Sequence, residues 1–229
     1  MGQAIADFYK TRKNKKIAVL SDIAEKEYIN SSYLFRTYDE MPELEQLALQ
    51  SVKGKVLDIG AAAGCHAIYL QNVGYHITAL EQSELACKTM KAAGVKNVIN
   101  SRIEEYNAHN YDTVLLLMNG IGIAGYLNKL PSFINHLQTL LKPGGQIIFD
   151  SCDIKYLYML DDGSELINLN QLYYGELTYQ MKYKSHMSEK FPWLFVDAET
   201  LQEQIKKLGN NLEFISKTDT GQYLARVTH

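Results

Sequence analysis

The chain has 229 residues, and 46% of them are hydrophobic, so it can bury a sizeable core. Asp and Glu (26 residues) outnumber Lys and Arg (23 residues), and the resulting net charge of −3 argues against a nucleic-acid partner. No apolar run reaches the roughly 20 residues that span a bilayer, and the first ten residues lack the apolar centre of a secretory signal. These features predict a cytoplasmic protein without a membrane partner.

The cysteine and histidine residues show no pattern typical of disulfides or metal sites. Cys65, Cys87 and Cys152 are odd in number and contain no CxxC pair, which fits a reducing compartment. The six histidines show neither HxxxH nor HExxH spacing. We therefore expect free thiols and no metal.

Residues 1–50 carry helix-like patterning. Ile5, Phe8 and Tyr9 share one helical face, and Pro42 is well placed to open a second helix. The pattern predicts a mostly helical N-terminal segment.

From Lys55 onward, short apolar strands alternate with helical stretches, the pattern of a parallel sheet covered on both faces. The predicted strands are Lys55–Ile59, His76–Glu81, Asn97–Ser101, Thr113–Met118 and Gln146–Asp150. The predicted helices between them are Cys65–Asn72, Ser83–Ala93 and Leu130–Leu141. Lys142-Pro143-Gly144-Gly145 is typical of a turn into the fifth strand.

After Asp150 the pattern changes to aromatic residues at alternating positions, which indicates antiparallel strands. A helix over Ala198–Leu208 and a closing strand pair complete the chain; the two strands are Leu212–Lys217 and Gln222–Val227. We expect an α/β fold with a doubly wound, seven-stranded, mostly parallel sheet. The predicted organisation is a helical lid at residues 1–50 and a catalytic domain at 51–229, with an antiparallel insertion on the substrate side at about 151–197.

The candidate site lies where the first predicted strand turns into a helix through small residues. Asp58 stands near the end of that strand, and Glu81, 81 − 58 = 23 positions later, ends the next one. In an open parallel sheet, ligands bind beyond the carboxyl ends of the strands. The glycines at 60 and 64 flank Ala62, so the GxGxxG fingerprint of dinucleotide sites is absent, although nicotinamide sites also use an acid like Glu81.

Four segments in this order resemble the class I S-adenosylmethionine-dependent methyltransferases, which have a Rossmann-like sheet. They are VLDIGAAAG at 56–64, ITALEQS at 77–83, YDTVLLLMNGIG at 111–122 and LKPGGQIIFD at 141–150. The resemblance extends over about residues 40–150.

The resemblance implies S-adenosyl-L-methionine as cofactor and assigns its contacts. Gly60 and the turn of Ala61, Ala62 and Gly64 would pack against its methionine part, which Asp58 would orient. Glu81 would hold the ribose, with Gln82 beside the adenine. Arg102, Ile103 and Glu104 would border the adenine ring, and the backbone of Met118 and Asn119 would face the methionyl amino group.

Two positions depart from the family pattern. Ala62 stands where the family usually has glycine, and Arg102 stands where an acid often contacts the adenine amine, which leaves that contact to Glu104 or to backbone groups.

The acceptor side is expected from the N-terminal segment and the insertion. Tyr33 and Arg36 would fold over the cofactor, with Arg36 meeting a carboxylate, and Tyr174 and Trp193 would line an aromatic pocket for a small or cationic acceptor. The alternative is core packing, which is the more frequent reason for apolar residues on a helix and for alternating aromatic residues in strands.

We therefore predict a methyltransferase that acts on a small-molecule acceptor, with no catalytic residue or oligomeric state assigned. One alternative is a non-catalytic S-adenosylmethionine-binding or regulatory protein, in which Ala61–Ala63 have spoiled the site. A nicotinamide-dependent oxidoreductase is a third hypothesis.

Overall fold

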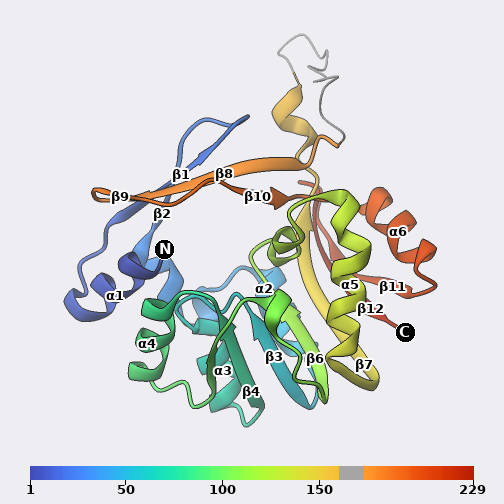
Figure 1. The fold of residues 1–229 in the computed structure, drawn as a ribbon, viewed down its shortest axis with the longest axis horizontal. Helices are drawn as coiled ribbons and strands as arrows, with labels where there is room; N and C mark the ends of the chain where they lie inside the picture. The colour runs from blue at the N-terminus through green and yellow to red at the C-terminus, as the bar shows by residue number, and fades with distance from the viewer. Residues whose placement is uncertain (160–172) are drawn as a thin grey trace.

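A seven-stranded sheet forms the centre of the molecule, and the computed structural model describes residues 1–159 and 173–229 (Figure 1). The strand order is β11-β12-β7-β6-β3-β4-β5. The strands β3 to β7 are parallel to one another, whereas β12 runs antiparallel to both β7 and β11. The bounds are β3 Lys55–Ile59, β4 His76–Glu81, β5 Val98–Asn100, β6 Tyr111–Leu116, β7 Leu141–Cys152, β11 Asn211–Lys217 and β12 Gln222–Thr228. This confirms the predicted doubly wound sheet.

Helices cover both faces of this sheet because successive strand residues point to opposite sides. Val56 packs in one core with α2, α3 and α4, and its neighbour Leu57 packs in the other core with α5 and α6. The helices are α2 Glu43–Gln50, α3 Cys65–Asn72, α4 Glu84–Ala92, α5 Leu130–Thr139 and α6 Ala198–Lys207. All the helices expected from Cys65 onward are present, with ends shifted by at most two residues.

The fifth parallel strand, β7, is longer than its predicted range. Tyr111 pairs with Leu141 and Thr113 pairs with Gln146, so the four residues between them bulge out of the ladder. Gly144 has a φ of 75° in this bulge. The predicted turn at residues 142–145 is thus an irregularity within β7.

A second, smaller sheet has the order β10-β8-β1-β2, and β9 pairs with β8. All its pairs are antiparallel. The bounds are β1 Lys16–Ser21, β2 Glu27–Asn30, β8 Glu176–Tyr183, β9 His186–Met187 and β10 Phe191–Leu194. Figure 1 shows β1, β8 and β10 crossing above one end of the larger sheet. We call this smaller sheet the cover sheet.

The predicted helical N-terminal segment is correct for α1 (Gly2–Thr11) and α2 but wrong for residues 16–30. The short apolar run Ile17–Val19 has no periodicity that separates a strand from a helix. Its partner strand β8 lies about 160 residues later in the chain, since Ala18 pairs with Lys182 and Ser21 pairs with Tyr179. The insertion strands therefore form a sheet with the N-terminal segment. Residues 160–172 of the insertion lie outside the described residues.

The cover sheet joins the rest of the protein through a small apolar cluster. Ile17 and Tyr183 from its inner face are buried with Ile5, Ala63 and Ala86. This cluster links α1, the loop after β3 and the start of α4. No helix in residues 1–159 or 173–229 is long and apolar enough to cross a bilayer.

Replacing Ile17 by Ala tests whether the N-terminal strand belongs to the folded core. Ile17 is 0% exposed, so Ile17→Ala should lower the free energy of unfolding by about 2–5 kcal/mol in urea denaturation. Tyr28→Ala, on the outer face of the same sheet and 53% exposed, is the control and should cost less than about 1 kcal/mol. Equal losses for the two variants would contradict the described packing.

Candidate functional site

The loop after β3 has the backbone conformation of a close-approach turn. Gly60, Ala62 and Gly64 have φ values of 72°, 50° and 84°, all left-handed. The backbone N–H groups of Gly60 and Ala61 both donate to the carbonyl oxygen of Leu80, at 2.9 and 3.2 Å. The loop is therefore tied to β4 before α3 begins. Alanine adopts the left-handed region only at a cost, so Ala62 retains the turn but adds strain.

Glu81 fixes this loop from the neighbouring strand. Its Oε2 accepts the N–H of Ala62 at 3.0 Å, and its Oε1 accepts the N–H of Ser83 at 2.8 Å, where α4 begins. A carboxylate has about four acceptor positions, so two remain for a ligand.

Two buried carboxylates have an oxygen without a partner. Asp58 Oδ2 and Asp150 Oδ1 are buried and make no hydrogen bond within the part of the chain that the structure describes. Burial raises the pKa of Asp58 to about 6, with His66 opposing and Glu81 adding to the rise. Burial also raises the pKa of Asp150 to about 6, against the lowering effect of the Asn119 N–H. Both groups are mostly ionised at neutral pH and suit a cationic ligand.

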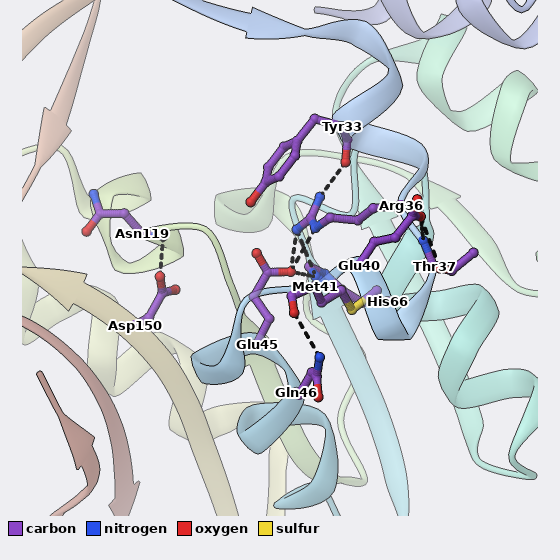
Figure 2. A network of polar contacts seen from close by, with 10 residues as sticks. All are labelled: Tyr33, Arg36, Thr37, Glu40, Met41, Glu45, Gln46, His66, Asn119 and Asp150. Carbon is purple, nitrogen blue, oxygen red and sulfur yellow. Dashed lines mark hydrogen bonds and ion pairs between the residues drawn. The ribbon is translucent and has the colours of Figure 1, made fainter.

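Arg36, Glu45 and His66 form a buried ionic network near these two carboxylates (Figure 2). Arg36 donates from Nε (3.1 Å) and from Nη2 to Glu45 Oε2, and His66 Nε2 lies 2.8 Å from the same oxygen. The third donor, Nη1, reaches the carbonyl oxygen of Tyr33 at 2.7 Å. The network joins the 3₁₀ helix η1 (Ser31–Phe35), α2 and α3.

Burial and neighbouring groups act in opposite directions on the ionisation of His66 and Glu45. Burial disfavours the His66 imidazolium, but Cys65 and Glu45 outweigh it and raise its pKa to about 10. Burial likewise opposes ionisation of Glu45, yet His66 and Arg36 hold its pKa below the ordinary value. Arg36 and His66 therefore share one carboxylate oxygen inside this network.

The loop after β6 is strained and firmly held. Met118 and Asn119 are left-handed, with φ of 64° and 55°. The Asn119 N–H donates to Asp150 Oδ2 at 2.9 Å, and its side chain donates to the carbonyl of Leu194 at 3.1 Å and accepts from Ser151 Oγ at 2.9 Å. Left-handed backbone at non-glycine residues is typical of functional sites. The loop thus connects β6, β7 and the end of β10.

The structure brings most predicted cofactor contacts to one edge of the sheet, since β3, β4 and β6 all end there. The residues at that edge are Asp58, Gly60, Ala61, Ala62, Gly64, Glu81, Met118 and Asn119. Gln82 follows β4 and is exposed. After β5, Ile103 is buried, while Arg102 and Glu104 are exposed and form an ion pair at 3.4 Å.

The residues expected on the acceptor side lie in different surroundings. The Tyr33 ring covers the Arg36 guanidinium at 4.2 Å. Trp193 packs so closely on Gly122 that a methyl group there would clash with the indole. Tyr174 donates to Asp153 Oδ1 at 2.8 Å and packs against Tyr173.

Sequence reasoning gave no role to Glu45, His66 and Asp150. Asp150 lies two residues before the end of β7, much as Asp58 lies one residue before the end of β3, and that placement was a usable signal. The sequence contains no comparable signal for Glu45 and His66, because their pairing depends on how α2 packs against α3. Among the described residues, no group of three metal-ligating side chains gathers.

Glu45→Gln tests the ionic network. Without its charge, two buried cations face each other, so the free energy of unfolding at pH 7 should fall by about 3–5 kcal/mol. Glu84→Gln is the control, because its ion pair with Lys88 is exposed, and it should change stability by less than about 0.5 kcal/mol. A loss below about 1 kcal/mol for Glu45→Gln in urea denaturation would refute the argument.

Ala62→Gly tests the strained turn. Glycine removes the left-handed strain and retains the N–H to Glu81, so stability should rise by about 0.5–1 kcal/mol despite the greater freedom of the unfolded chain. Ala61→Gly, at a buried neighbour outside the left-handed region, should instead lose about 0.5–1 kcal/mol. Denaturation curves of both variants check the signs, and a loss in both would contradict the strain.

Comparison with known proteins identifies the family. A family model described as a methyltransferase domain matches residues 31–213. A search of the curated proteins gives no match. Among solved structures, a SAM-dependent methyltransferase from Bacteroides fragilis, in complex with S-adenosyl-L-homocysteine, is 39% identical, with a TM-score of 0.92. The match covers 99% of this chain and 93% of that chain.

More distant structures share the fold alone. A S-adenosylmethionine-dependent methyltransferase from Clostridium acetobutylicum is 13% identical (TM-score 0.55), and the match covers 80% of this chain and 87% of that one. The CcbJ methyltransferase from Streptomyces caelestis is 14% identical (TM-score 0.61), and the match covers 83% of this chain and 93% of that one.

The family match also settles the cofactor, which is S-adenosyl-L-methionine rather than a nicotinamide dinucleotide. The chain belongs to the class I S-adenosylmethionine-dependent methyltransferases and is an enzyme of that family.

Proposed function

We propose that this methyltransferase binds its cofactor between the β3 loop, Glu81 and the Met118–Asn119 loop and methylates a small molecule. The observation that carries the placement is the unpartnered, buried oxygen of Asp58 beside the left-handed turn. A buried carboxylate oxygen without a hydrogen bond needs a donor, and the cofactor's ammonium group supplies one.

The charges of the site fit the cofactor, which has a sulfonium, an ammonium and one carboxylate. Asp58, Glu81 and Asp150 offer negative charge to the two cationic groups. The cationic side chains Arg36 and His66 suit the carboxylate, so the proposal keeps the expectation that Arg36 meets one.

The other contacts are proposed as the family resemblance implies. Gly60, Ala61, Ala62 and Gly64 pack on the methionine part, and Glu81 offers its two free acceptor positions to the ribose hydroxyls. The adenine lies beside Gln82 and is bordered by Arg102, Ile103 and Glu104. Tyr33, Tyr174 and Trp193 belong to the acceptor side.

Methyl transfer needs alignment more than acid chemistry. The bound cofactor supplies a methyl group activated by positive sulfur. The chain's residues hold the reactants in line and exclude water, and the cover sheet contributes by covering the carboxyl ends of the strands.

Several features support a small acceptor. The net charge of −3 disfavours nucleic acid, and Met118-Asn119-Gly120 differs from the Asn-Pro-Pro-aromatic sequence of enzymes that methylate amines of bases or glutamine amides. The conformation of Ala62 supports an intact turn, against the alternative of a spoiled, non-catalytic site. We also propose a cytoplasmic location, which the free thiols Cys65, Cys87 and Cys152 fit.

Glu81→Ala tests the cofactor site. Wild-type protein should bind S-adenosylhomocysteine at micromolar strength, and loss of the ribose contacts should weaken binding about 10- to 100-fold in calorimetry. Glu84→Ala is the matched control on the exposed side of α4 and should bind normally. Because Glu81 also accepts hydrogen bonds from the loop, thermal melts without ligand must first show that the variant is folded. Glu81→Gln is the milder second variant, since its amide oxygen can still accept one of these hydrogen bonds. Unchanged affinity in both variants would refute the placement.

The acceptor itself requires a screen. Purified enzyme, S-adenosylmethionine and pooled metabolites should release S-adenosylhomocysteine only with acceptors, and fractionation of active pools identifies them. Release with nucleic acid or protein fractions alone would overturn the small-molecule assignment.

A further inference from the structure

A cavity of about 180 Å³ lies between the cover sheet and the end of β7. Val19, Glu27 and Tyr179 contribute to it from the cover sheet, and Cys152 contributes from β7. None of the residues assigned to the cofactor lines it. Cys152 lies two residues beyond Asp150 on the same face of β7, about 7 Å further along the strand.

Among the residues that the structure describes, the charged groups lining the cavity are all acidic. They are Glu25 and Glu27, and no described Lys, Arg or His lines it. The side chain of neither glutamate makes a hydrogen bond or an ion pair within residues 1–159 and 173–229. Their charges are therefore free to act on a ligand.

The cover sheet separates charge between its two faces. Glu27 pairs with Val19, which places both on the inner face, whereas Tyr28 and Lys182 both pair with Ala18 and lie on the outer face. The ammonium groups of Lys16 and Lys26 lie over the outer ring of Tyr28, at 5.2 and 4.9 Å. The basic side chains of this region are thus directed away from the cavity.

Aromatic rings complete the wall. Tyr179 and Phe195 line the cavity and meet edge to face, with centroids 6.2 Å apart, and Tyr156 lines it from the segment after β7. Burial, and then the charge of Glu27, raise the pKa of Tyr179 to about 12, so its ring stays neutral. Neutral aromatic faces beside carboxylates attract organic cations, because the ring quadrupole and the negative charge act together.

We propose that this cavity binds an alkylammonium group of the methyl acceptor, a substrate class that rests on the proposed function above. An ammonium nitrogen has no lone pair with which to attack a methyl group. The cation in the cavity is therefore the recognition end, and the nucleophile is a second group of the same molecule, closer to Asp150.

Calorimetry with choline and 3,3-dimethylbutan-1-ol tests the proposal, since the two probes share a shape and differ in charge. On protein saturated with S-adenosylhomocysteine, choline should bind at least about ten-fold more tightly than the neutral alcohol. Added salt should weaken choline binding and leave the alcohol unchanged.

Variants locate the binding. Glu27→Gln and Tyr179→Leu should each weaken choline several-fold while S-adenosylhomocysteine affinity stays the same. The matched controls are Glu189→Gln, at an exposed position beyond the cavity, and Tyr28→Leu, on the outer face; both should bind choline as wild type does.

The outcomes separate the two proposals. Equal affinity for both probes, no choline binding, or binding unaffected by Glu27→Gln overturns the ammonium cavity, even when S-adenosylhomocysteine binds normally. Failure of S-adenosylhomocysteine to bind overturns the proposed function. In that case, titration of the ligand-free protein with choline tests whether the cavity binds an ammonium group independently of the cofactor.

Discussion

The contact on which the site depends is the shared oxygen of Glu45, which holds Arg36 and His66 together. It connects three segments: the turn that leads out of the cover sheet, the helix α2 and the helix α3 that follows the cofactor loop. Each partner would be unfavourable if buried alone, because an isolated charge loses its hydration. The network therefore sets the position of the N-terminal segment over the cofactor loop.

Acidic and basic side chains are distributed unevenly across the site. Asp58, Glu81 and Asp150 end or nearly end parallel strands, Arg36 and His66 lie on Glu45, and the described charged residues of the cavity beyond β7 are acidic. If the acceptor is cationic as proposed, these carboxylates would offset its repulsion from the cationic cofactor.

The sequence was sufficient to predict the central sheet because its signals are local. Apolar strands such as Val56–Ile59 stand beside a small-residue turn, and four segments in order identify the family. The cover sheet was predicted only in part, because the alternating aromatic residues indicated strands such as β8 but nothing indicated the partner strand β1. Strand pairing over about 160 residues leaves no local signal, and neither does the meeting of Glu45 with His66. Where the predicted roles concern a ligand, such as Gln82 beside adenine, they stay predictions.

The pairing of β1 with β8 also has a consequence for biosynthesis. A ribosome releases β1 and its neighbour β2 early, but the other edge of β1 has no partner until residues 176–183 emerge. During that interval Ile17 and Val19 lie on an unsatisfied edge, which is a template for intermolecular association. The closing of this long loop is the non-local step that delays folding, so a nascent or truncated chain is the form of this enzyme most in need of a chaperone.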